Sequence, residues 1–305
     1  MNCYLTSHKA LRKKGVVGVI DCPVEELPYS DLEELYNIVR EYSEKLGFTN
    51  KIAFDSNEAI GTTHILYRFH ITIPGGYIGV RVVTRNRRVY RILYTIPDDK
   101  YLENIEFEKY DPSPDLTGKT PINARGQYYI DYPVVYASLG IPRVNPEKWV
   151  LTINGLVEKP VKLTLADLYS MELETIVIDF HCVTGWSVRN MKFTGVPLNR
   201  ITELVKPRSD VEWIYAESLD GYSTIIPYRE ALNNGGILAL EMNDKPLTLE
   251  HGYPARLVIP GLYGWKSIKW VHHIEFRKEY IDGYWEALGY HPRGRVDYEE
   301  RFKQA

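Results

Sequence analysis

Three consecutive strand-like runs limit the possible folds more than any other feature of the chain. They cover residues 64–73, 77–84 and 89–96 and are rich in β-branched and aromatic side chains, as strands are. Pro74-Gly75-Gly76 separates the first two runs, and the polar residues 85–88 separate the last two. Strands joined by connections this short pair as antiparallel neighbours. The sequence therefore predicts a three-stranded meander.

A helical pattern precedes these runs. Ser30 and Glu33 have the spacing of a capping box, and Gly47 stands where a helix would end. Apolar residues recur between them at helical spacing, at Leu32, Leu35, Val39, Tyr42 and Leu46. A helix followed by a meander is typical of a small α+β domain, which we place at residues 1–110. This domain contains no chemical motif, and its role is left open.

Residues 111–305 are predicted to form a second domain. Residues 97–121 are rich in Asp, Pro and Gly and indicate a linker or surface crossing between the two. Beyond it, short strand-like runs alternate irregularly with short helical patterns. There is no regular βαβ alternation and no G-x-G-x-x-G, so a dinucleotide-binding fold is not supported. We expect an α+β protein whose second domain is β-rich and mixed.

Composition excludes several classes of function. The chain has 305 residues, with 37 basic and 40 acidic side chains and a net charge of −3, which does not suggest a nucleic-acid partner. No apolar stretch reaches the roughly 18 residues of a membrane span. The first thirty residues lack the layout of a secretion signal, so we expect a cytoplasmic protein. A low glutamine content with many charged residues hints at a heat-adapted source.

The chain has three cysteines, Cys3, Cys22 and Cys182, which do not suggest a disulfide framework. None lies in a C-x-x-C pattern, so a haem or iron–sulfur site is not expected. Cys182 follows a β-branched apolar run at residues 175–180, which predicts a buried strand, and Gly185 then turns the chain. Such a position holds a thiol rigidly at the end of a strand.

Four interpretations of Cys182 remain open on the residues alone. It could be a small buried hydrophobe, a zinc ligand, a nucleophile with His251 as its base, or the thiolate ligand of a metal cofactor. Zinc would need further ligands, and His272 and His273 are adjacent on a predicted strand and so point to opposite faces. The cofactor interpretation is favoured by Arg256 and Lys269, which flank Gly-containing loops suited to a phosphate group.

From about residue 120 onwards, ordered motifs resemble the sulfite oxidase family of mononuclear molybdenum enzymes. Within that family the resemblance is greatest to the branch that includes the prokaryotic methionine-sulfoxide reductase catalytic subunits. The matching segments are residues 180–187, 220–224, 241–243, 250–270, 283–286 and 289–291. Residues 1–110 lie outside the resemblance.

The resemblance implies that Cys182 ligates molybdenum beside one molybdopterin. It implies further cofactor contacts from nine other residues. These are Tyr136, His181, Ser218, His251, Arg256, Lys266, Ser267, Ile268 and Lys269. It also implies two-electron oxygen-atom transfer on a small substrate, with electrons exchanged through a separate partner protein.

Two departures from the family pattern bear on the substrate. Leu240 stands in the place of an active-site tyrosine, and Ser187 stands in the place of a sulfite-binding arginine, the nearest arginine being Arg189. Sulfite oxidation is therefore not expected, and the substrate is left open. Leu240 also motivates the alternative of a non-catalytic protein that binds or carries molybdopterin. The domain at residues 1–110 is a candidate docking surface for the electron partner or for a second copy in a homo-oligomer.

Overall fold

The computed structural model describes residues 2–61, 63–116 and 124–303, and the chain falls into two compact units. The first comprises Met1–Gly118, Ala287–His291 and Phe302–Ala305, and the second comprises Lys119–Glu286 and Pro292–Arg301. The first unit is thus completed by two short segments from the end of the chain. Both units are mostly β, and among the described residues only one helix exceeds eight residues. Helices contribute less than the predicted α+β class implied.

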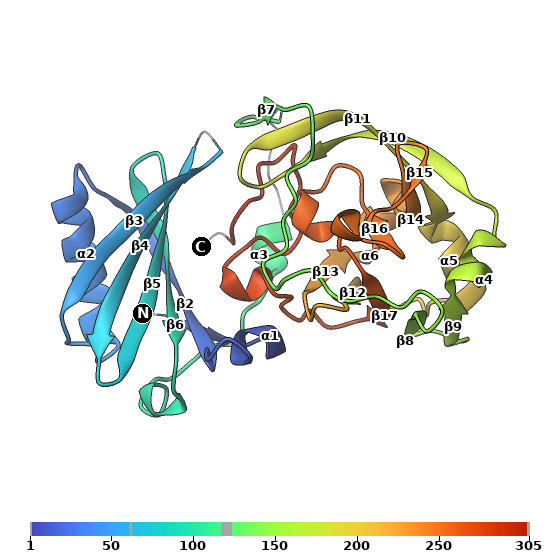
Figure 1. Cartoon of the computed structure of the whole chain (residues 1–305). Helices are drawn as coiled ribbons and strands as arrows, with labels where there is room; N and C mark the ends of the chain where they lie inside the picture. The colour runs from blue at the N-terminus through green and yellow to red at the C-terminus, as the bar shows by residue number, and fades with distance from the viewer. Residues whose placement is uncertain (1, 62, 117–123, 304–305) are drawn as a thin grey trace. The chain divides into compact units, whose positions relative to one another are not determined.

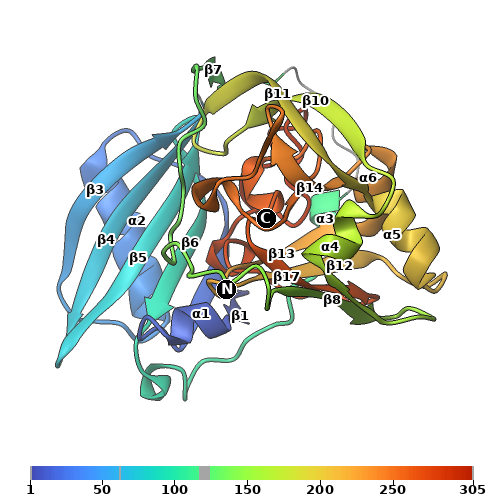
Figure 2. The same cartoon turned by 45° about the vertical axis from the view of Figure 1, so that its right-hand side comes forward.

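The first unit contains a six-stranded antiparallel sheet in the order β1-β2-β6-β5-β4-β3 (Figures 1 and 2). The predicted meander is confirmed as β4, β5 and β6, but the sheet has three further strands that the sequence did not reveal. The strands are β1 (Tyr4–Thr6), β2 (Gly18–Pro28), β3 (Ile52–Ile60), β4 (His64–Ile73), β5 (Gly76–Arg85) and β6 (Arg88–Ile96).

Helix α2 (Leu32–Lys45) covers one face of this sheet, as Figures 1 and 2 show. Leu35 and Val39 of α2 are fully buried in the core of the unit. The helix begins one residue later than predicted, because Asp31 is the cap and accepts a hydrogen bond from the backbone NH of Glu34 at 3.0 Å. The Glu34 carboxylate in turn accepts one from the NH of Ser30 at 2.6 Å. A second, short helix is α1 (Lys9–Arg12).

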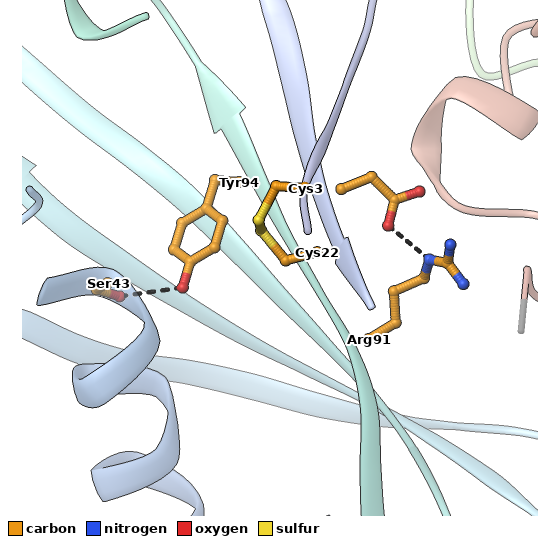
Figure 3. The surroundings of a disulfide bond; sticks show 6 residues. Cys3, Cys22, Ser43, Arg91 and Tyr94 are labelled. Carbon is orange, nitrogen blue, oxygen red and sulfur yellow. Dashed lines mark hydrogen bonds and ion pairs between the residues drawn. A yellow bond between two sulfur atoms is a disulfide. The ribbon is translucent and has the colours of Figure 1, made fainter. Parts of the chain in front are cut away.

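A disulfide joins Cys3 to Cys22 (Figure 3), and both cysteines belong to the same core cluster as Leu35 and Val39 of α2. The prediction that the cysteines form no disulfide was therefore wrong. Figure 3 also shows Tyr94 reaching Ser43 of α2, with 3.3 Å between their hydroxyl oxygens. Asp21, next to Cys22 on β2, instead pairs with the buried Arg91 at 2.5 Å. The disulfide ties the short edge strand β1 to β2.

The second unit contains two sheets. One has the order β10-β11-β14-β15, with β16 paired to β14 and β7 paired to β11. The other has the order β13-β12-β17-β8-β9, with β8 and β17 parallel. The strands are β7 (Tyr128–Tyr129), β8 (Val150–Gly155), β9 (Val161–Thr164), β10 (Glu174–His181), β11 (Trp186–Pro197), β12 (Trp213–Ser218), β13 (Ser223–Pro227), β14 (Ile237–Met242), β15 (Lys245–Pro246), β16 (Arg256–Val258) and β17 (Val271–Arg277). This confirms a β-rich mixed second unit.

Apolar side chains from both sheets and from short helices form the core of the second unit. Leu151 and Ile274 come from one sheet, and Leu238 and Leu257 come from the other. The short α-helices are α4 (Leu165–Tyr169), α5 (Leu198–Val205) and α6 (Tyr228–Asn233). The 3₁₀ turns η2 (Leu249–His251) and η3 (Gly264–Lys266) lie between β15 and β17, and η4 (Glu286–Leu288) follows β17. Both sheets thus share one hydrophobic core.

The predicted linker lies partly outside the described residues, and the predicted last strand begins later than expected. Residues 117–121 of the predicted linker are outside the described residues, and the part before them contains η1 (Asp99–Tyr101) and α3 (Ser113–Leu116). The last strand was predicted from residue 267 but begins at Val271, because Trp270 has a φ of 51° that interrupts an extended chain. No helix in the described ranges is long and apolar enough to cross a membrane.

Candidate functional site

Cys182 opens the hairpin loop that connects β10 to β11. Its NH donates to the carbonyl of Trp186 at 2.9 Å, and the NH of Gly185 donates back to the carbonyl of Cys182 at 3.1 Å. Gly185 has a φ of 110°, which favours glycine and closes the loop. A β-bulge between Ile178 and Phe180 adjusts the register before the loop. The backbone therefore fixes the position of the thiol.

The strand that carries Cys182 is less buried than the sequence suggested. Among the described residues β10 pairs with β11 alone, and Val177 is 59% exposed. Cys182 itself is a free, partly buried cysteine, and its Sγ lies 3.2 Å from the hydroxyl of Thr184. Burial raises the pKa of the thiol, while Thr184 and the nearby Arg301 act in the opposite direction. The thiol is thus not sealed in the main core of the unit.

His181, next to Cys182, is held by hydrogen bonds on the other side of the strand. Its Nδ1 lies 2.7 Å from the hydroxyl of Ser187, which in turn lies 2.8 Å from the side-chain amide of Gln127. Burial lowers the pKa of His181, which favours a neutral imidazole. The Ser187 hydroxyl therefore fixes the orientation of the His181 ring.

Arg256 lies in a pocket lined by backbone carbonyl acceptors, and no carboxylate among the described residues pairs with it. Nη1 donates to the carbonyl of His251 at 3.2 Å and Nη2 to that of Ser267 at 2.9 Å. Its guanidinium carbon is 5.5 Å from the centre of the Phe180 ring, two residues before Cys182. Burial lowers the pKa of Arg256 to about 10. Phe180 therefore links this cation to the strand that carries the thiol.

Lys269 is a second cation in the same region. Its Nζ donates to the carbonyls of Tyr136 at 2.6 Å and Glu250 at 2.9 Å. Burial, with Arg256 nearby, lowers the pKa of Lys269 to about 8. The pKa of His251 is likewise lowered, first by burial and then by these two cations. Mutual repulsion and burial thus make this cluster receptive to an anion.

Three buried polar atoms in this region lack hydrogen-bond partners among the described residues: Ser218 Oγ, His251 Nε2 and Arg256 Nε. Gly252, with a φ of 111°, lets the backbone approach closely, because an added Cβ would lie 3.0 Å from Lys269 Cβ and 3.1 Å from Arg256 Cβ. Buried polar groups are normally satisfied, so unpaired ones call for a ligand or bound water. Unpaired donors with cations suit a phosphate-bearing, polar ligand.

Lys266 and Ile268, two of the residues predicted to bind the cofactor, have buried side chains that contact other parts of the protein. The ammonium of Lys266 is fully buried and donates to the carbonyls of Ile225 and Pro292, each at 2.5 Å, and to the carboxylate of Glu286 at 2.6 Å. All three of its donors are therefore occupied. Ile268 is 1% exposed and belongs to the hydrophobic core. The structure does not support a cofactor contact for the Lys266 side chain.

The remaining predicted residues lie beside Arg256 and Lys269, which we call the cation cluster. The hydroxyl of Ser267 accepts a hydrogen bond from the NH of Ile259 at 3.2 Å, so this serine mainly shapes the loop below Arg256. Tyr136 is exposed, and its contribution to the cluster is the carbonyl that accepts from Lys269. Ser218, His251, Arg256 and Lys269 are thus brought together, with Cys182 and His181 joined to them through Phe180.

The structure gives no support to the zinc or nucleophile interpretations of Cys182. No group of three or more His, Cys, Asp or Glu side chains within the described ranges is arranged to hold a metal. The imidazole of His251 bonds through Nδ1 to Thr248 at 2.9 Å rather than to the thiol. In the part of the chain that the structure describes, Thr184 supplies the side-chain hydrogen bond to the thiol.

The two residues that depart from the family pattern, Ser187 and Leu240, are both buried. Ser187 has no exposed surface and bonds to His181 and Gln127. Leu240 is 1% exposed and lies in the main core. Arg189 stacks over Tyr129, with its guanidinium carbon 3.9 Å from the ring centre. Sequence reasoning missed Gln127. Its rarity was a signal that could have identified it, since glutamine occurs at only two positions in the chain.

Comparisons with known proteins agree with this chemistry. Residues 138–285 match the family model described as oxidoreductase molybdopterin binding domain. The chain is 35% identical over 188 residues to the uncharacterized oxidoreductase YuiH of Bacillus subtilis, covering 62% of this chain and 94% of that protein. It is 33% identical over 160 residues to the protein-methionine-sulfoxide reductase catalytic subunit MsrP of Campylobacter jejuni, covering 47% of this chain and 54% of that relative, or about half its length.

Among solved structures, the sulfane dehydrogenase SoxCD from Paracoccus pantotrophus matches with a TM-score of 0.43 and 25% identity, covering 57% of this chain and 50% of that chain.

Proposed function

The chain belongs to the family of oxidoreductases with a molybdopterin-binding domain, and we propose that it is a sulfite oxidase-like enzyme that performs two-electron oxygen-atom transfer. In this proposal one molybdopterin carries the molybdenum, and Cys182 is the protein ligand of the metal. Thiolates are suitable ligands for such soft, redox-active metals. When bound, this cofactor supplies the redox chemistry, while the protein supplies position and electrostatics.

The observation that carries the proposal is a fixed, partly accessible thiol linked to two cations, Arg256 and Lys269, that form no ion pair with a carboxylate among the described residues. The loop from Cys182 to Gly185 presents the sulfur at a defined place. Arg256 and Lys269 would hold the phosphate of the pterin, and Ser218 Oγ and His251 Nε2 would hold its polar edges. These two atoms have no partner among the described residues, so a ligand would satisfy them.

The substrate of the proposed enzyme is a small neutral oxygen donor or acceptor rather than the sulfite anion. Ser187 is buried and bonded within the protein, and Arg189 is stacked on Tyr129 at the surface. Ser187 carries no charge and Arg189 is engaged with Tyr129, so neither position supplies the arginine expected for a sulfite site. Because MsrP relatives are named for protein-methionine-sulfoxide reduction, a sulfoxide is the substrate class to test first. Electrons would be exchanged with a separate partner protein.

Metal analysis of protein purified from cofactor-replete cells tests the proposed ligand. We expect near-stoichiometric molybdenum in the wild type and its loss in Cys182→Ser. Cys22→Ser is the matched control, because Cys22 lies in the first unit within a disulfide and should leave the metal content unchanged. Zinc or no metal in the wild type would contradict the proposal.

Turnover of the loaded protein then tests the substrate. With a reduced artificial electron donor we expect reduction of methionine sulfoxide, and with an oxidised artificial electron acceptor we expect little oxidation of sulfite. A fully loaded protein that turns over neither compound would favour the second candidate, a non-catalytic molybdopterin-binding or carrier protein, which Leu240 in the core motivates.

The location of the protein in the cell is likewise a proposal. The Cys3–Cys22 disulfide fits an oxidising compartment, or the cytoplasm of a hyperthermophile, where intracellular disulfides are common. The second possibility agrees with both the cytoplasmic and the heat-adapted expectations from the sequence. Cell fractionation, with the thiols of each fraction blocked at once, would distinguish them.

A further inference from the structure

The segment Pro292–Arg301 near the end of the chain belongs to the second unit and brings a buried arginine to the Cys182 loop. Arg301 has no exposed surface, and its Nη1 donates a hydrogen bond to the carbonyl of Val183, the residue after Cys182. Its Nη2 donates to the carbonyl of Arg125 at 3.1 Å. The guanidinium carbon lies 4.8 Å from the centre of the Tyr263 ring. The arginine is therefore held in one orientation behind the loop.

Arg301 also begins a chain of hydrogen bonds that ends beside Cys182. The Gln127 amide is best satisfied when its oxygen accepts from Arg301 Nη2 at 3.0 Å and its nitrogen donates to Ser187 Oγ at 2.8 Å. The Ser187 hydroxyl is then free to donate to Nδ1 of His181 at 2.7 Å. Every donor in this chain points the same way, and such chains strengthen cooperatively. The arrangement fixes both sides of the loop that carries the thiol.

The segment is anchored by contacts that do not involve Arg301. Arg293 forms a bidentate pair with Glu300, which is fully buried. Arg295 approaches Glu230 of α6 at 3.6 Å and stacks on Tyr298 at 3.8 Å. Because these anchors are separate from the Cys182 loop, substitutions there should weaken the segment without removing the contact to the loop. They offer a matched control.

We propose that Arg301 is a positioning residue for the metal ligand, acting on the Cys182 loop from behind. This inference rests on the proposed function. Through the Val183 carbonyl and the Gln127–Ser187–His181 chain, Arg301 holds the loop in the conformation that presents the thiolate. Glu299 lies 3.4 Å from Nε and offsets part of the charge, so position is the main contribution and the electrostatic effect is smaller. Groups that orient a metal ligand typically affect metal affinity about 10–100-fold.

Molybdenum content per chain is the principal readout. We expect Arg301→Met to contain at least about tenfold less molybdenum than the wild type under limiting cofactor. Gln127→Leu breaks the same chain without altering the C-terminal segment, and we expect it to lower the content in the same direction. Arg301→Lys, which keeps a donor and a charge, should recover part of the content. Arg295→Met should load like the wild type.

The midpoint potential of the metal in the loaded fraction separates positioning from a general loss of stability. We expect it to fall in Arg301→Met, because a cation near the metal favours the more reduced state, and to stay unchanged in Arg295→Met. Wild-type content and potential in both Arg301→Met and Gln127→Leu would overturn the inference. So would an equal loss in Arg295→Met and Arg301→Met at equal unfolding midpoints. A wild-type protein without molybdenum would instead remove the proposed function itself, and the inference with it.

Discussion

Lys266 and Lys269 lie three residues apart in different surroundings, from which we predict different roles that a substitution at each position can distinguish. The ammonium of Lys266 is fully buried and pairs with the fully buried Glu286 at 2.6 Å. Lys269 is only half-buried and bonds to two backbone carbonyls. We therefore predict that Lys266→Met destabilises the second unit, whereas Lys269→Met weakens cofactor binding.

The expected loss of stability in Lys266→Met depends on the groups that remain around Glu286. Removing one partner of a buried ion pair costs about 3–5 kcal/mol, because the other charge stays buried without compensation. Glu286 would keep two donors, Trp265 Nε1 at 3.1 Å and Thr224 Oγ1 at 2.9 Å, and Met fills most of the volume of the lysine stem. We therefore expect the lower end, a loss of about 3 kcal/mol. Lys266→Met combined with Glu286→Gln should recover most of it, since no buried charge remains.

Urea unfolding followed by tryptophan fluorescence measures these differences, with molybdenum content measured on the same samples. Lys269→Met is the matched control and should change the free energy of unfolding of the cofactor-free protein by less than about 1 kcal/mol. If Lys266→Met unfolds like the wild type but loses the cofactor, Lys266 binds the cofactor after all and our interpretation of the buried pair is refuted.

Two further predictions concern the disulfide and the cation cluster. Cys22→Ser, or a reductant, should lower the free energy of unfolding of the first unit by about 3 kcal/mol, because the disulfide joins residues 19 apart; an unchanged urea midpoint under reductant would contradict this. Inorganic phosphate should bind the cofactor-free protein more weakly as the pH rises through about 8, where Lys269 loses its proton. Calorimetry should show this step in the wild type but not in Lys269→Met, and an identical profile in both would argue against it.

Local patterns in the sequence were enough to predict β4, β5 and β6. These strands are rich in β-branched and aromatic residues and short turns join neighbours, so each element is defined by its own residues. β2 was missed because it carries Asp21, which is buried only because Arg91 on β6 pairs with it. β3 was missed because it is an edge strand whose central residues are exposed and polar. In both cases the strand is identified by its pairing with another strand, which the residues of the strand itself do not show.

The disulfide could not be predicted for a related reason. The antiparallel register pairs Tyr4 with Asp21, and this places Cys3 opposite Cys22. Their spacing along the chain carries no such information, because pairing depends on the register of two strands separated by a helix. The burial of β10 was overestimated for the opposite reason. Its residues are largely apolar, but in the part of the chain that the structure describes the strand pairs with β11 alone.

In the candidate site, contiguous motifs pointed to Cys182, Arg256 and Lys269, whose roles stay predictions. They were not enough to exclude Lys266, because its occupied donors depend on Ile225, Glu286 and Pro292, which come from three other segments. Arg301 was missed for the same reason, since its contacts at Val183 and Arg125 lie more than a hundred residues away in the chain.

The cation cluster itself argues that the second unit is built around a ligand. Burial lowers the pKa of Arg256 to about 10 and that of Lys269 to about 8, so keeping both charged at neutral pH destabilises the empty protein. Nearby, His251 and Ser218 each leave a buried polar atom unpaired among the described residues. Lys266, equally cationic, is instead neutralised by a carboxylate and fully bonded. A fold that pairs one buried lysine with a carboxylate, but leaves buried polar atoms of Ser218, His251 and Arg256 unpaired among the described residues, is what we expect of the proposed anion site.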